Sequence, residues 1–302
     1  SNGSAVIVSG ARNTVLNQAG GLVRAGDQLT GVGGIGITFE NIPVTEESNR
    51  TTGGAAFSLA AFAPNANGNM LINEAGARID AGNGISVLGS SFGEVVTNAG
   101  TIIGKVVLGD GDDSFTSTGG VISGNLDTGA AGASLVTDND LVDLGGTTML
   151  TGDIMTGVGD DSITIKEMAQ LNGSILAGAD NDTVTVQDSA FVSGGIDLGD
   201  GDDVLTVSFA ASDTLTGAGP LTGIGGAVTG GTGMDTLAFS NAAGTTNSRN
   251  VGDIGTTLAQ FDFERAGFNG AGTLNLSGAA QFNSTFAVLG GTVVSQANVS
   301  GA

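Results

Sequence analysis

The sequence predicts an all-β protein, a single right-handed parallel β-helix of about 14 turns with roughly 21 residues per turn. Three observations lead to this prediction: a fixed repeat, alternating apolar residues in short β-branched stretches, and glycine at their boundaries. The repeat is clearest at the last aspartate of each acidic cluster, because successive copies are separated by 27, 21, 21, 21 and 32 residues. These copies are Asp113, Asp140, Asp161, Asp182, Asp203 and Asp235.

Apolar positions keep the same step, as in the series Ile163, Val184 and Leu205. Within a unit, an alternating stretch follows the acidic cluster, and a second apolar stretch lies around Leu171 and Ile175. Such a unit cannot bury its inner face alone, but it can when it is stacked on copies of itself. Equivalent residues of successive turns would then lie about 4.8 Å apart and form inward ladders. The right hand follows the general preference of parallel crossovers.

We expect one domain over 1–302, with the period strongest in 63–240 and looser in 241–302. The segment 1–37 contains "VLNQAGGLV", which shares its Asn and Ala-Gly with "LINEAGARI" (71–79) and "VVTNAGTII" (95–103). Between them, 38–62 fits no repeat and is predicted to leave the helix as an excursion loop.

A second loop is expected over 211–226, where Gly, Thr and Ala lengthen one unit by about eleven residues. Both loops, together with the flat polar faces of the rod, are candidates for specific contacts.

Composition excludes several classes of function. Thirty acidic against eight basic residues give a net charge of -22, so phosphate backbones and anionic lipids would be repelled. Cysteine and histidine are both absent, which removes disulfides, thiolate nucleophiles, imidazole bases and ordinary zinc or copper sites. Only oxygen ligands remain, and these suit calcium or magnesium.

The acidic clusters allow two interpretations. Four copies satisfy G-x-G-x-D-x-U, which resembles half of the calcium-binding nonapeptide of repeats-in-toxin proteins. In that family nonapeptides follow one another directly, whereas one half-match occurs here per 21 residues. Aspartates can equally accept backbone N–H groups in tight glycine turns. A calcium site would use Asp110, Asp112, Asp113, Asp160, Asp161, Asp180, Asp182, Asp200, Asp202, Asp203 and Asp235.

The phrases "VTNAGTIIGKVVLGDGDDSF" (96–115), "LTGDIMTGVGDDSI" (150–163) and "GTLNLSG" (272–278) resemble the degenerate repeats of AIDA-like autotransporter passenger domains of Gram-negative bacteria. The resemblance covers most of the chain apart from 38–62. It implies a secreted, right-handed rod that a C-terminal barrel carries through the outer membrane, serving adhesion, self-association, biofilm formation or virulence. Nothing near Ala302 resembles the amphipathic strands of such a barrel, so we expect the passenger alone.

Catalysis is a third interpretation, because some parallel β-helices cleave polysaccharides. The aspartates recur as a ladder instead of one constellation, and no Trp or Tyr is present to stack on sugar rings. A histidine triad is impossible, and no G-x-S-x-G motif occurs. We therefore expect no enzyme.

The sequence thus favours an adhesin or self-association rod at the bacterial cell surface. Its partner would be a host or matrix receptor, or another copy of itself, with no nucleic acid and membrane attachment only through a separate barrel. The alternative is a secreted repeat protein that folds when calcium binds.

Overall fold

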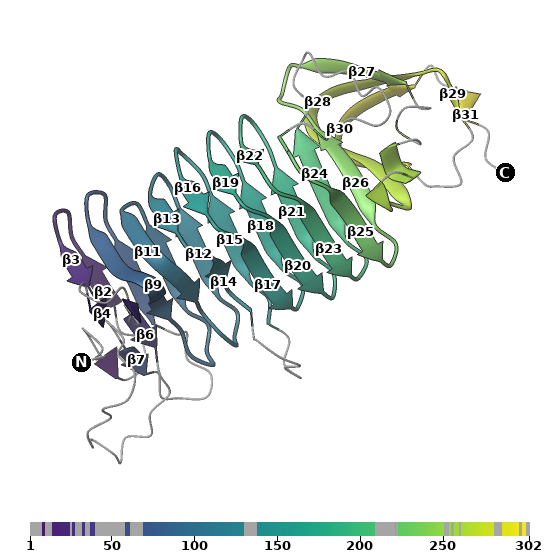
Figure 1. Cartoon of the computed structure of the whole chain (residues 1–302). Helices are drawn as coiled ribbons and strands as arrows, with labels where there is room; N and C mark the ends of the chain where they lie inside the picture. Colours follow the sequence, from purple (N-terminus) through teal and green to yellow (C-terminus); the bar gives the residue numbers. More distant parts are fainter. Residues whose placement is uncertain are drawn as a thin grey trace.

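The computed structural model describes residues 8–9, 14–24, 26–27, 32–33, 37–39, 58–60, 69–129, 138–208, 221, 223–250, 254, 257–259, 261–280, 286–295 and 298–299. Nearly all of them lie in strands and tight turns stacked along a rod (Figure 1). Among these residues, strand pairs are parallel except for β4 (Gly26–Asp27) with β5 (Val32–Gly33). The predicted all-β class and parallel β-helix are confirmed. The hand and the number of turns stay predictions.

Each regular coil carries three strands, which stack on their equivalents to form three faces. Face 1 consists of β2 (Thr14–Asn17), β8 (Met70–Asn73), β10 (Val95–Asn98), β12 (Ser114–Ser117), β15 (Leu141–Leu144), β18 (Ser162–Ile165), β21 (Thr183–Val186), β24 (Val204–Ser208), β26 (Thr236–Ser240) and the start of β28 (Arg265–Ser277). Face 2 consists of β3 (Leu22–Arg24), the first parts of β9 (Arg78–Leu88) and β11 (Thr101–Val107), β13 (Val121–Ser123), β16 (Met149–Thr151), β19 (Gln170–Asn172) and β22 (Phe191–Val192). Face 3 consists of the remainder of β9 and β11, β14 (Leu126–Asp127), β17 (Ile154–Val158), β20 (Ile175–Ala179), β23 (Ile196–Asp200) and β25 (Val228–Thr232).

The core is a set of apolar ladders in strict register. Ile163 lies beside Val184, and Val184 beside Leu205, as the 21-residue step predicts. These side chains and the equivalent Leu171 and Ile175 are fully buried. Alternation along strands such as β18 and β21 places every second side chain outside, so these coils share one continuous interior.

Parts of the two predicted loops pair with strands of the rod. β6 (Ile37–Phe39) and β7 (Ser58–Ala60) pair in parallel, so both ends of the 38–62 excursion belong to the sheet, and 40–57 lies outside the described residues. Likewise Ile224 forms a parallel bridge with Val192, so the end of the 211–226 loop continues face 2. Residues 209–220 lie outside the described part.

The C-terminal coils are built differently. β27 (Thr246–Asn250) pairs with the second half of β28, whose first half continues face 1, and β30 (Phe286–Ser295) pairs with both halves. A short helical stretch includes 257–259, and its neighbourhood buries Phe261 and Phe263. The remaining strands are β1 (Val8–Ser9), β29 (Ala279–Ala280) and β31 (Asn298–Val299). Among the described residues, no helix is long and apolar enough to cross a membrane.

Candidate functional site

The acidic clusters form the turn that leaves face 3 and enters face 1. In one copy, β17 ends at Val158 and β18 begins at Ser162, with Asp160 and Asp161 between them. Glycine is required just before the turn, because a Cβ on Gly199 would lie 1.9 Å from the carbonyl oxygen of Gly178 in the neighbouring coil. The glycine repeat therefore reflects the close stacking of backbones.

The last acidic residue of each turn belongs to a continuous inner row along the rod. Its members are Glu94, Asp113, Asp140, Asp161, Asp182, Asp203, Asp235 and Glu264. The N–H of Asp161 donates to Oδ1 of Asp182 at 2.9 Å, and the N–H of Asp182 donates to Oδ1 of Asp203 at 2.7 Å. The same bond joins every neighbouring pair in the row. Each carboxyl thus accepts a hydrogen bond from a backbone N–H at a corner where no strand carbonyl is available as an acceptor.

An outer row runs beside the inner row and bonds in the opposite direction. The N–H of Asn181 donates to Oδ1 of Asp160 at 2.8 Å, and the N–H of Asp202 donates to Oδ1 of Asn181 at 2.9 Å. The outer side chains are exposed, and they continue toward the N-terminus through Asn139 and Asp112. The two rows together tie each coil to both of its neighbours.

The second oxygen of the inner aspartates has a different environment. Oδ2 is buried and receives no hydrogen bond in Asp113, Asp140, Asp161, Asp182, Asp203 and Asp235. Ionised carboxylates there would be desolvated beside one another, and both effects favour the neutral acid.

Burial is the largest cause of the raised pKa values of Glu94 and the six aspartates of the inner row. It raises the pKa of Asp113 to about 11 and that of Asp140 and Asp182 to about 8. The pKa of Glu94 rises to about 7. It rises to about 6 in Asp161 and Asp235, and it is also raised in Asp203. These shifts favour the protonated form of Asp113, Asp140 and Asp182 at neutral pH.

The predicted calcium residues divide between the two rows and the start of the turn. Asp113, Asp161, Asp182, Asp203 and Asp235 lie in the inner row, and Asp112, Asp160 and Asp202 lie in the outer row. Asp110, Asp180 and Asp200 lie exposed at the start of their turns, and Asp200 accepts a 2.6 Å hydrogen bond from Thr232. Within the described part of the chain, no three acidic side chains are grouped as metal ligands.

Sequence reasoning missed both ends of the inner row. Glu94 directly precedes β10, and Glu264 directly precedes β28, as each inner aspartate precedes its own strand on face 1. It also missed Asn139 and Asn181, which occupy outer positions without a charge. The position of a residue in the turn directly before a face-1 strand could have identified these four residues. Any side chain with an acceptor oxygen at that position can accept the backbone N–H of a neighbouring coil.

Comparison with known proteins shows no family for this chain. No protein-family profile matches the chain, and no curated protein matches it. Among solved structures, the chain is similar to a hyperactive, Ca2+-dependent, β-helical antifreeze protein from an Antarctic bacterium. The identity is 21%, the match covers 99% of this chain and 78% of that chain, and the TM-score is 0.39. The assignment as a parallel β-helix therefore rests on the strand pairings themselves, and the autotransporter resemblance stays a prediction.

Proposed function

We propose that the chain is a non-enzymatic rod at the bacterial cell surface that acts in adhesion or self-association, as the passenger of an autotransporter would. One observation carries this proposal: the outward sides of faces 1 and 2 are almost uncharged in a chain of net charge -22. From β8 to β24, the outward residues of face 1 include one charged side chain, Asp143, and Lys166 neutralises it at 2.7 Å.

Face 1 presents a regular threonine row in place of charge. Thr164 lies in register with Thr185, while Thr97 and Thr116 continue the row beyond Asp143. The row ends at Thr206, which is next in register but buried. Flat uncharged strands of this kind lose little solvation when a partner covers them. Repetition along the rod allows many weak contacts to act together.

One hollow in the described part of the chain lies on face 3. It has a volume of about 220 Å³ and is lined partly by Lys105, Asp127 and Met155. Ligand pockets usually enclose about 300 to 1,000 Å³ and gather several polar groups around one point. The inner carboxyls instead form a long row that already bonds to backbone N–H groups.

Display on a non-aggregating bacterial host tests the proposal. Cells that carry the rod should settle faster or bind matrix-coated surfaces, and a Thr164→Glu/Thr185→Glu variant of face 1 reports whether that face contributes. Asp160→Asn, on the exposed outer row, is the control for expression and folding. Display that produces neither aggregation nor binding would contradict the proposed function.

A calcium-stabilised secreted repeat protein is the second candidate. The observation that favours it is the set of six buried Oδ2 atoms without a donor, since oxygen is the ligand that calcium prefers. The two candidates differ in circular dichroism of chelator-treated protein. The adhesion rod should show β-structure with chelator present, whereas the calcium-dependent protein should stay unfolded until millimolar calcium is added.

A further inference from the structure

Face 2 carries an apolar stripe that no described element covers. Val121, Met149, Gln170 and Phe191 follow one another in register on its outer side. Val121, Met149 and Phe191 are 44%, 40% and 43% exposed, and Met168 at the adjoining corner is 59% exposed. The next outward row is Ser123, Thr151, Asn172 and Ser193. Large apolar residues with a polar rim and no charge are typical of protein interfaces.

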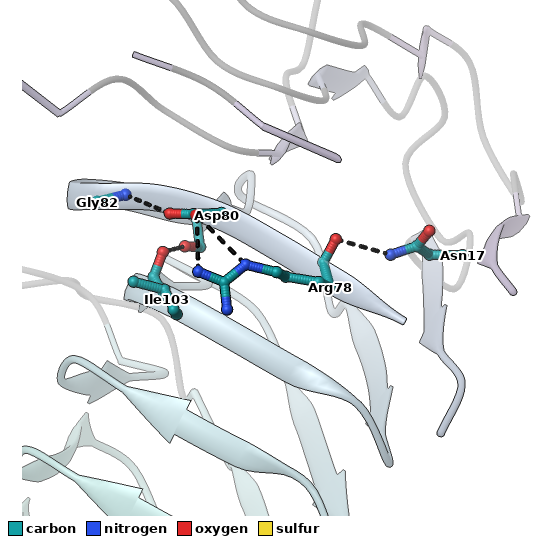
Figure 2. Close-up of polar contacts among 6 residues, drawn as sticks. Asn17, Arg78, Asp80, Gly82 and Ile103 are labelled. Carbon is teal, nitrogen blue, oxygen red and sulfur yellow. Dashed lines mark hydrogen bonds and ion pairs between the residues drawn. The ribbon is translucent and has the colours of Figure 1, made fainter. Parts of the chain in front are cut away.

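Charge on face 2 is confined to its N-terminal end. Arg78 and Asp80 form an ion pair at 2.8 Å, and Asp80 also accepts the N–H of Gly82 (Figure 2). From β13 to β22, the described side chains of this face carry no charge at all. The outward side of these four strands is therefore neutral in a strongly negative chain, and the exposed carboxylates of Glu167 and Asp188 border it at the corner with face 1.

Connectivity places the stripe away from the acidic turns. Those turns join face 3 to face 1, so face 2 is the one face that does not share their corner. At the corner between faces 1 and 2, the carboxylates of Glu167 and Asp188 accept backbone N–H groups of Gly146 and Glu167.

We propose that a second copy of this chain docks on the stripe, so that two rods pack face to face through face 2. The occupant follows from charge, because each copy carries the same acidic corner. Packing through face 2 keeps both corners on the outside, roughly 30 Å apart, well beyond the Debye length of about 8 Å at physiological salt. Packing through face 1 or face 3 would bring acidic corners toward each other.

The size of face 2 sets the strength of this contact. Its seven described strands span about 34 Å along the rod and, at three residues for most strands, roughly 10 Å across, which gives about 340 Å² per copy. A total of about 700 Å² lies well below the roughly 1,200 Å² of stable interfaces and belongs to the weak, transient class. Dimerisation is accordingly weak in solution, and it gains strength where many rods stand together on a surface. This inference rests on the proposed function and names its partner.

Sedimentation velocity over a concentration series, from micromolar to about 1 mM, tests the pairing. The wild-type chain should show concentration-dependent dimerisation. Met149→Asp and Phe191→Asp should each weaken it about ten-fold or more, because each buries an unpaired charge in the contact. Leu141→Asp on face 1 and Leu176→Asp on face 3 are matched controls, since both side chains are 42% exposed and the added charge is the same. These controls should leave dimerisation unchanged.

A mixture of Met149→Lys and Met149→Asp chains supplies the positive test. The mixed chains should associate more tightly than either variant does alone, and added salt should weaken this extra affinity. Circular dichroism checks that every variant melts like the wild type. If the face-2 variants and the control variants change dimerisation equally, this inference is overturned and the proposed function still stands. A strictly monomeric wild type would also overturn it, whereas the display experiment decides the proposed function separately.

Discussion

Two polar ladders lie at opposite ends of the face-1 strands and solve the same stacking problem differently. At the ends of β2, β8 and β10, Asn17 donates to Asn73 at 2.9 Å, and Asn73 donates to Asn98 at 2.8 Å. At the beginning of the later strands, the inner carboxyls accept backbone N–H groups instead. An amide carries both a donor and an acceptor, so identical amides can bond to each other, whereas a carboxylate can only accept.

The difference explains why only one ladder responds to pH. Every Asn in the amide ladder finds partners at any pH, and Asn17 also donates to the carbonyl of Arg78 (Figure 2). Each inner aspartate retains one buried oxygen with no donor, so the neutral acid is favoured. We therefore expect the acid ladder to stabilise the rod when protonated and to strain it when ionised.

The largest expected effect is on the pH dependence of stability. The pKa values rise to about 6 in Asp161, about 8 in Asp182 and about 11 in Asp113, above the usual value near 4 of the unfolded chain. The folded state thus holds more protons, so the free energy of unfolding falls as pH rises through this window. Denaturant unfolding in chelator should show a loss of several kcal/mol between pH 5 and pH 8. Constant stability over that range would contradict the account.

Asn73→Asp should convert one position of the amide ladder into an acid. Its Oδ2 would then face Oδ1 of Asn98, and a buried charge would replace a donated hydrogen bond. We expect a destabilisation of about 3 kcal/mol at pH 8, partly recovered at pH 4.5 where the new carboxyl is protonated. Denaturant unfolding at pH 8 and pH 4.5 measures the destabilisation and its recovery. An equal loss at both would show that charge is not the cause.

Asp182→Asn should do the reverse in the acid ladder. The amide oxygen can still accept the N–H of Asp161, and no charge can form. At pH 9 the variant should be about 1 kcal/mol more stable than the wild type, and this gain should vanish near pH 4.5. Urea unfolding at pH 9 and pH 4.5 compares the variant with the wild type. A variant that is less stable than the wild type at pH 9 would argue against strain from ionised carboxyls.

The smallest effect is expected for Asp160→Asn in the outer row. Asp160 is exposed and its Oδ1 accepts the N–H of Asn181, a role that an amide fills equally well. Thermal unfolding should place the variant within about 0.5 kcal/mol of the wild type at either pH. A larger change would show that the outer row is coupled to the inner one.

Much of the fold could be predicted because the period repeats both the apolar ladders and the glycine turns. The register of Ile163, Val184 and Leu205 follows directly from it. The sequence could not separate the inner from the outer aspartates, since "GVGDD" contains both and only the bend at Gly159 and Asp160 turns Asp161 inward. The sequence also could not show that Glu94 and Glu264 extend the inner row. A glutamate does not match the aspartate of the G-x-G-x-D pattern, although its carboxyl oxygen can accept the same hydrogen bond.

The protonation state of Asp182 tests the central claim most directly. Carboxyl carbon NMR of aspartate-labelled protein, in chelator and with Asp182→Asn for assignment, follows its titration. A stacked, neutral ladder predicts a pKa of about 8 for Asp182, because burial penalises its charge. A pKa near 4 in the folded rod would contradict the account and would show that the inner row tolerates its own charge.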